Sequence, residues 1–336
     1  KMLLRLFSDS KPGTAILLLI LATLLWLPGF MSNDLGMVES ISREMPLYRM
    51  LADLMEGQSV LLSKIIAFLF ILFQAILVVW LNARFILIQE RTFLPAFFFI
   101  LLVSFYLQHL QFSEYIFGSL GMIIILNFLF TSYKMERNSW KFFEAGLMLG
   151  IAALFYARMI YFLPFLWIAQ IILRPPFWRE WIYPVAGVFV PAFLYVSLRY
   201  LFNQNPWEAW DIFHRNLNDF TFTFNYSRAY LIIAIYIFLL IVIASIYMLR
   251  IFQFRKIYIR NYYHVFFWLF VTSVTLFTFF TRFDAGILYM SAVPVSFILS
   301  NYFINARRTK MNRILFGLIL LIFLGNGVNH WFGWLG

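Results

Sequence analysis

Long apolar runs alternate with short polar segments along the whole chain of 336 residues. Runs of about 20 apolar residues are long enough to cross the hydrocarbon core of a bilayer as helices. By this criterion the spans are 14–31, 60–82, 92–108, 115–132, 142–157, 159–173, 182–202, 229–249, 262–281, 285–304 and 312–328. The pattern predicts an all-α, polytopic transmembrane helical bundle of about 11 spans, built as a single domain over residues 1–336.

The composition supports a membrane protein. Hydrophobic residues make up 63% of the chain, charged residues make up 12%, and the mean hydropathy is +0.83. A net charge of +11 would suggest nucleic acid as the partner of a soluble protein, but here it reflects which side of the membrane each charge occupies. We therefore expect membrane lipids as partners and no nucleic acid. The chain has no cysteine, so disulfides and thiolate metal sites are excluded, and we predict no metal and no cofactor.

Charge decides how residues 142–174 are arranged. This stretch is continuous apart from Arg158, and it forms either one long helix with a buried arginine or a hairpin. The hairpin places 18 of the 26 basic residues and 5 of the 15 acidic residues inside, so that the two faces carry +13 and −2. A single span would turn the basic segments 250–260 and 305–313 outward, against the positive-inside rule. We therefore predict a hairpin, a cytoplasmic N-terminus and an extracytoplasmic C-terminus.

The two longest segments between spans, 32–59 and 203–228, are both predicted to lie outside. In the first loop, apolar residues recur at intervals of three and four, which predicts short amphipathic helices on the membrane surface, separated at Pro46. Glu39 with Arg43 and Arg49 with Asp53 are spaced to pair along such helices, an arrangement that stabilises an exposed helix slightly. Chemistry carried by this protein is expected in these two loops.

Asp34 lies where the first span leaves the membrane and a following helix begins. A helix N-cap explains an aspartate there, because its carboxylate accepts a hydrogen bond from a free backbone amide. A carboxylate near the bilayer surface is also partly desolvated, which suits a general base. Both interpretations of Asp34 stay open, and one residue can serve both roles.

The second loop is expected to begin with a helix after Pro206 and to continue into alternating aromatic residues between 220 and 226. Aromatic residues at this depth are typical of the interfacial belt, and they also form a platform for a sugar ring or an isoprenoid chain. His214, Arg215 and Arg228 add cationic or hydrogen-bonding groups beside this segment, and they are candidates for substrate binding.

Three further charged residues occupy very short outward turns: Arg158, Arg282 and Asp284. Arginines there can extend to the lipid headgroups, and Arg282 can pair with Asp284. Alternatively, the guanidinium groups bind a phosphate oxyanion, for which their forked geometry is well suited.

An acid after the first span, surface helices behind it, arginines in short turns and a long aromatic loop together resemble the GT-C superfamily of polytopic glycosyltransferases. The resemblance implies an inverting transfer of sugar from a polyprenyl-phosphate donor to an acceptor on the extracytoplasmic face. It implies Asp34 as the catalytic acid, with Glu39 as second choice, and Arg158, Arg228 or Arg282 as ligands of the lipid phosphate. Alternatively, the chain belongs to an uncharacterised family of bacterial inner-membrane proteins, and we expect it in the bacterial inner membrane. The tight acid pairs found in many such enzymes are absent from the first loop.

Two other classes remain open. A transporter or flippase for a lipid-linked solute usually has polar residues within its spans, and here these are few, among them Gln74, Asn127 and Gln170. A non-catalytic subunit of an envelope or export complex requires only the spans and would have protein subunits as partners.

The predicted sidedness can be checked directly because the chain has no cysteine. Cysteine introduced at Ser32 or Asn218 is expected to react with a membrane-impermeant reagent in intact cells. Labelling that occurs only after lysis would overturn the assignment.

Overall fold

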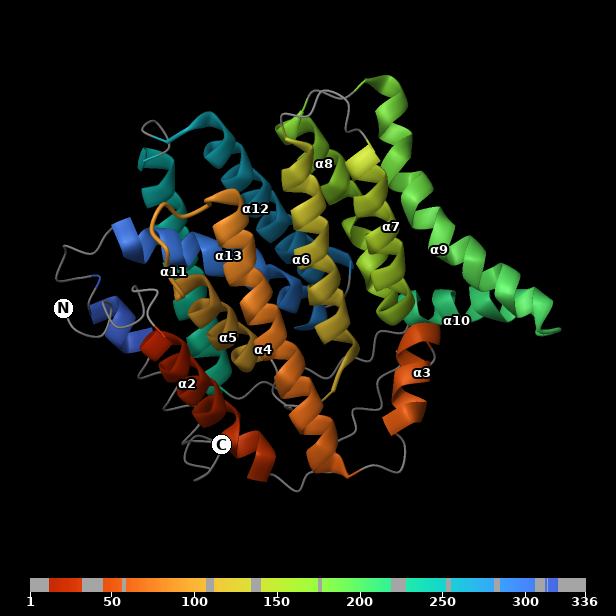
Figure 1. The fold of residues 1–336 in the computed structure, drawn as a ribbon, viewed down its shortest axis with the longest axis horizontal. Coiled ribbons are helices and arrows are strands. Elements are labelled where there is room, and N and C mark those ends of the chain that lie inside the picture. The colour runs from red at the N-terminus through yellow and green to blue at the C-terminus, as the bar shows by residue number, and fades with distance from the viewer. Residues whose placement is uncertain are drawn as a thin grey trace.

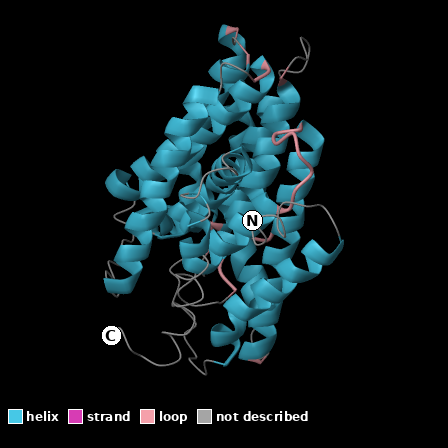
Figure 2. Cartoon of the chain, turned by 90° about the vertical axis from the view of Figure 1, so that its left-hand side faces the viewer, coloured by secondary structure: helices cyan, strands magenta, loops and turns pink. Residues whose placement is uncertain are grey.

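The computed structural model describes residues 12–31, 45–55, 59–106, 112–133, 140–174, 177–218, 228–251, 255–280, 285–305, 312 and 314–319. Within these residues every regular element is a helix, as Figure 2 shows. The first part of the chain forms α2 (Pro12–Met31), α3 (Pro46–Met55), α4 (Val60–Phe85), α5 (Leu94–Tyr106), α6 (Glu114–Ser132), α7 (Trp140–Phe155), the 3₁₀ helix η2 (Ala157–Phe162) and α8 (Leu163–Leu173). The second part forms the 3₁₀ helix η3 (Trp178–Trp181), α9 (Ile182–Leu201), α10 (Pro206–Asn218), α11 (Arg228–Ile251), α12 (Ile257–Thr275), the π-helical turn η5 (Leu276–Phe280) and α13 (Ala285–Asn305). The predicted all-α class is confirmed.

Six helices in the described part of the chain are long and apolar enough to cross a bilayer, so this is an integral membrane protein. They are Val60–Phe85, Glu114–Ser132, Trp178–Leu201, Ile233–Arg250, Ile257–Phe279 and Gly286–Asn305. The segments Gly13–Leu27, Leu94–Ser104 and Ala157–Leu173 are also apolar but shorter. The total of about 11 spans stays a prediction.

Helix α13 forms the centre of the bundle, because 94% of its membrane-length window is buried. It packs against α5, α6, α11 and α12. Its buried serine hydroxyls donate hydrogen bonds to backbone carbonyls of the same helix. Ser296 donates to the Val293 carbonyl at 2.7 Å, and Ser300 donates to the Ser296 carbonyl at 2.6 Å. Small, internally satisfied residues let apolar helices approach closely without leaving polar groups unpaired in the membrane.

The chain reverses between α7 and α8, which confirms the hairpin. Helix α7 ends at Phe155, Tyr156 is extended, and η2 leads into α8. Helices α7 and α9 then run parallel, since Gly146 faces Pro184 and Gly150 faces Val188. Because α7 and α9 run in the same direction, α8, which connects them, runs in the opposite direction, as Figure 1 shows.

The ends of the helices define two ends of the bundle. Helices α3 and α10 lie at one end, called here the α3/α10 end, while α6 and α8 end, and α7 and α9 begin, at the other (Figure 1). Most described basic residues occupy turns or helix ends at this second end, called the basic end: Arg84, Arg91, Lys141, Arg174, Arg179, Arg250, Arg255, Lys256 and Arg260. The charge segregation inferred from the sequence is therefore present in the fold, and the membrane side of each end stays a prediction.

The contact between α7 and α9 depends on glycine. A Cβ atom on Gly146 would collide with the backbone carbonyl of Pro184, and one on Gly187 would collide with the Phe143 carbonyl. We expect Gly146→Ala to lower the free energy of unfolding by about 1–3 kcal/mol, because two backbones must separate to admit one methyl group. The measurement is thermal unfolding of the purified protein in detergent.

Gly13→Ala is the matched control, since a Cβ atom on Gly13 would meet nothing within 4 Å. Alanine also has the higher helix propensity there, so this variant should lose no stability. Equal unfolding temperatures for the two variants would contradict the proposed glycine contact.

Candidate functional site

The α3/α10 end is built from both of the loops in which chemistry was expected. Helices α3 and α10 each begin with a proline, Pro46 and Pro206, at a helix start where a missing backbone N–H costs nothing. The predicted helix after Pro206 is confirmed. The side chain of Asn205 accepts a hydrogen bond from the Trp207 backbone amide at 3.0 Å, which satisfies a donor in the first turn of α10.

The apolar face of α3 packs against protein. Met45 and Tyr48 are buried, and the Tyr48 hydroxyl donates to the Phe112 carbonyl at 3.0 Å while the two rings stack with centroids 6.2 Å apart. Met45 and Tyr48 form a small hydrophobic cluster with Phe117 and Ala157, separate from the main core. The bundle therefore covers the apolar face of α3 that carries Tyr48, whereas Arg49, Met50, Asp53 and Leu54 are exposed. The location of α3 at the membrane surface stays a prediction.

Helix α10 completes the same cluster from the other side. Its side chains Ile212, Phe213 and Leu217 pack against it, and Phe213 and Leu217, four residues apart, share one helix face. The cluster thus joins α3, α10 and the start of η2, and it fixes the two loop helices to the bundle.

Arg158 is the predicted site residue that this arrangement positions. It follows Ala157 of the cluster in η2, it is half-buried, and its Nε atom is enclosed. His214 and Arg215, by contrast, lie on the exposed face of α10. The structure therefore brings α10 close to Arg158 but keeps these two polar side chains on the outer surface.

The other predicted site residues are not tested. Asp34, Glu39, Arg282 and Asp284 lie outside the described residues. Arg228 is the first residue of α11, but its side chain is also outside the described part.

Of the two ion pairs expected in the first loop, Arg49 with Asp53 is present. Arg49 Nε and the Asp53 carboxylate are 4.0 Å apart, and both side chains are exposed. The pair is a surface contact of α3, as the spacing predicted, and exposed pairs of this kind contribute little to stability.

Glu114 is an acid that the sequence reasoning did not select. It is the first residue of α6 and is only 2% exposed. The next residue, Tyr115, meets Tyr156 with ring centroids 5.3 Å apart, and Tyr156 lies two residues before Arg158. A buried carboxylate thus lies in the neighbourhood of Arg158. A signal was available, because Glu114 is an acid at the start of an apolar span, beside an outward loop.

Lys64 is a second residue missed from the sequence. It lies inside α4, is 3% exposed, and donates to the Gly29 carbonyl at 2.6 Å. Gly29 belongs to the last turn of α2, where helix carbonyls lack partners and a positive charge is favoured. Lys64 therefore caps α2 from a neighbouring helix. A single lysine within an otherwise apolar span was the signal.

Arg199 is the third, near the C-terminal end of α9. Its guanidinium donates to the Tyr195 hydroxyl at 3.2 Å and to the Glu208 carboxylate of α10. The chain turns between the two helices through Asn203, whose φ of 53° lies in the left-handed region that asparagine tolerates. The Arg199 to Glu208 pair links the end of α9 to the first turn of α10. Arg199 lies just before the loop 203–228 that was selected from the sequence, and Glu208 lies within it.

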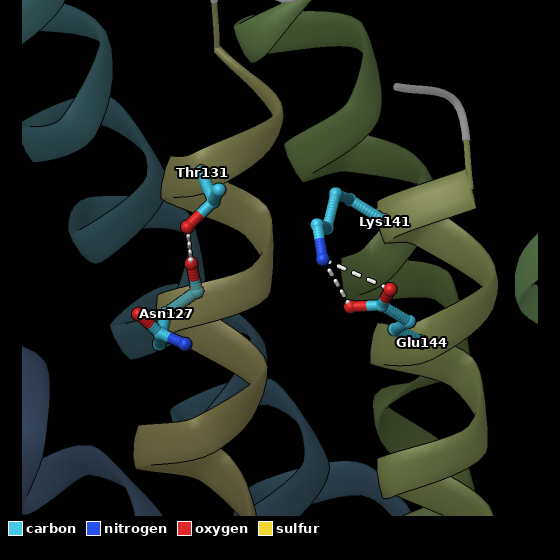
Figure 3. Close-up of polar contacts among 4 residues, drawn as sticks. All are labelled: Asn127, Thr131, Lys141 and Glu144. Carbon is cyan, nitrogen blue, oxygen red and sulfur yellow. Dashed lines mark hydrogen bonds and ion pairs between the residues drawn. The ribbon is translucent and has the colours of Figure 1, made fainter.

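At the basic end, by contrast, charges are paired locally. Figure 3 shows Lys141 and Glu144 of α7 beside α6, where the Thr131 hydroxyl donates to the Asn127 carbonyl at 2.7 Å. Lys141 donates to both carboxylate oxygens of Glu144 at 2.9 and 2.6 Å. These bonds account for the pair structurally. Over the part of the chain that the structure describes, no group of three or more histidine, aspartate or glutamate side chains could hold a metal ion.

Comparison with known proteins places the chain in a family. The sequence profile of a family of unknown function, DUF6427, matches residues 45–328. The chain belongs to this family. No curated protein and no solved structure matches it. The matched region begins at Met45 of the cluster and includes Glu114, Arg158 and Arg199, whereas Asp34 and Glu39 precede it.

Docking of α3 should depend on Tyr48. We expect Tyr48→Phe to remove the hydrogen bond to the Phe112 carbonyl and weaken the packing of α3 on the bundle by about 1 kcal/mol, because that partly buried carbonyl loses its donor. Hydrogen exchange of the α3 amides should accelerate about fivefold, which is the equivalent change in the opening equilibrium.

Asp53→Asn is the control, since it removes only an exposed pair on the same helix. It should leave exchange in α3 unchanged. If both variants exchange like the wild type, the Tyr48 hydroxyl does not hold α3 in place.

Proposed function

We propose that this protein is a GT-C-like membrane glycosyltransferase of the bacterial inner membrane, with about 11 spans. Its substrate would be a sugar on a polyprenyl phosphate, transferred with inversion to an acceptor at the α3/α10 end, which would face the extracytoplasmic side. The observation that carries the proposal is the grouping at this end. Two loop helices pack on η2, which bears the half-buried Arg158, and a buried acid, Glu114, lies nearby.

The chemistry needs few groups because a lipid phosphate is already a good leaving group. A carboxylate takes the proton of the acceptor hydroxyl while the hydroxyl oxygen forms a bond to the anomeric carbon of the sugar. The bond between that carbon and the phosphate oxygen breaks, and its electron pair leaves with the phosphate. An arginine that binds the departing phosphate would stabilise its developing charge, an effect that often dominates catalysis. A general base contributes on the order of 10²- to 10⁴-fold.

The identity of the base separates two versions of the proposal. The resemblance to the superfamily favours Asp34, with Glu39 second. The structure adds Glu114 as an alternative, because it is buried, lies at the α3/α10 end and falls within the region that defines the family.

Two observations weigh against a transporter. Gln74 and Gln170 are mid-span polar candidates for a transport path, and both bond to backbone carbonyls. Gln74 donates to Ile116 at 2.8 Å, and Gln170 donates to Glu180 at 3.2 Å. These bonds occupy the amide donors of both residues and leave them less available to a passing solute. The side-chain oxygens of Gln170 and Asn127, by contrast, are buried without a hydrogen-bond partner among the described residues. A non-catalytic subunit of an envelope complex stays the alternative.

The test is sugar transfer from a polyprenyl phosphate donor by the purified protein. We expect Arg158→Ala to abolish transfer and Arg158→Lys to retain part of it, since lysine keeps the charge but lacks the fork. Asp34→Asn and Glu114→Gln then distinguish the two candidate bases. The base is the residue whose variant loses activity while keeping the wild-type unfolding temperature.

Arg49→Ala is the control, because Arg49 is exposed on α3 and has no role in the proposed transfer. It should keep full activity. Release of no sugar by the wild-type protein from any polyprenyl phosphate donor, combined with movement of such lipids between vesicle leaflets, would replace the transferase by a flippase.

A further inference from the structure

Helix α9 packs on the bundle over only half of its length. Its buried residues, Pro184, Gly187 and Pro191, form one stripe that meets α7. Beyond Pro191 no residue of α9 is buried, and in Figure 1 this part of the helix leans away from α7. Only 17% of the membrane-length window of η3 and α9 is buried, compared with 94% for α13.

The same stripe becomes polar where the helices separate. Residues three or four apart share a helix face, so the stripe continues from Pro191 to Tyr195 and Arg199. These two side chains are bonded to each other at 3.2 Å. Polar groups on this face are unexpected in a helix whose flanks, such as Phe193 and Leu194, are apolar and exposed.

Arg199 contains a buried donor that lacks an acceptor. Its side chain is only 12% exposed, although Leu198 and Tyr200 beside it are exposed. One terminal nitrogen donates to the Tyr195 hydroxyl and the other to the Glu208 carboxylate, while Nε is buried and bonds to no described residue. A buried N–H without an acceptor destabilises the folded protein. The position therefore favours an acceptor from outside the protein.

The surroundings indicate the chemistry of that acceptor. An arginine fork binds phosphate oxygens well, and the apolar side chains along residues 192–201 suit a hydrocarbon chain. A molecule with both parts, in a membrane, is a lipid with a phosphate headgroup. We infer that one such lipid binds where α9 separates from α7, beside α10. Its phosphate would contact Arg199, and its hydrocarbon chain would lie along the second half of α9.

The alternative is that Arg199 serves only to brace α10 against α9 through Glu208. The Glu208 side chain is 59% exposed, and ion pairs with such exposed members contribute little to stability. The two explanations predict different effects for changes at the two ends of the pair. A brace needs both residues, whereas a lipid phosphate needs Arg199 and competes with Glu208.

The inference does not require sugar transfer, because a lipid would bind here in an enzyme, a transporter or a subunit. The experiment is therefore binding without turnover, measured by native mass spectrometry of the purified protein in a maltoside detergent, which contains no phosphate. The probes are a polyprenyl phosphate, phosphatidylglycerol, the matching polyprenol and inorganic phosphate. The wild type should bind the two phosphate lipids, and the polyprenol and free phosphate should bind at least about tenfold more weakly, since each lacks one of the two contacts.

Among variants, Arg199→Ala should weaken lipid binding about tenfold or more, and Arg199→Lys should weaken it less. Glu208→Gln should keep or increase binding, because it frees Arg199. Arg49→Ala, an exposed arginine on α3, should behave as the wild type, and unfolding temperatures show that each variant is folded. Equal loss in Arg199→Ala and Glu208→Gln, or undiminished binding in Arg199→Ala, would overturn the inference.

Discussion

The backbones of α7 and α9 are in contact at glycines, and the position of the candidate site depends on that contact. Gly146 and Gly187 lack the side chain that would push the two helices apart. Because these helices are parallel, α8 must return between them, and η2 with Arg158 is the turn that begins this return. The same contact ends at Pro191, beyond which α9 leaves the bundle and carries α10 with it. The positions of Arg158 in η2 and Arg199 in α9 thus both depend on this interface of small residues.

The second constraint is that polar groups inside an apolar bundle need partners within the protein. The structure meets it mostly with backbone carbonyls. Gln74 bonds to Ile116 and also accepts from Ser119 at 2.5 Å, Tyr262 donates to Phe130 at 3.2 Å, and Lys64 donates to Gly29. These bonds join neighbouring helices and explain polar residues that a sequence alone would offer as transport or catalytic candidates. Arg199 belongs to a smaller group of residues, with Asn127 and Gln170 among them, that keep a buried polar atom without a described partner.

The α3/α10 end and the basic end differ in how their charges are used. At the basic end, Lys141 pairs with Glu144 and Arg174 pairs with Glu180, each between residues close in sequence. At the α3/α10 end, buried or half-buried charged residues come from segments far apart in the chain, α6, η2 and α9, and two loop helices cover them in part. Ionisable groups buried near a membrane surface are costly and tend to be functional, which is why the proposals concentrate there.

Hydrophobic patterning by itself determined the helical class, the positions of the long helices and the helix after Pro206, because a span needs about 20 apolar residues whatever it packs against. Charge determined the hairpin at Arg158, since basic residues are segregated to one side of a membrane. The spacing of Arg49 and Asp53 predicted their ion pair, because contacts between residues four apart on a helix are local. The tertiary structure alone decided that α3 is covered by the bundle, that Glu114, Lys64 and Arg199 are buried, and that His214 and Arg215 are not. Burial of a single side chain depends on which distant helix packs against it, as α2 does against Lys64 and α10 against Arg199, and the local sequence pattern does not determine that partner.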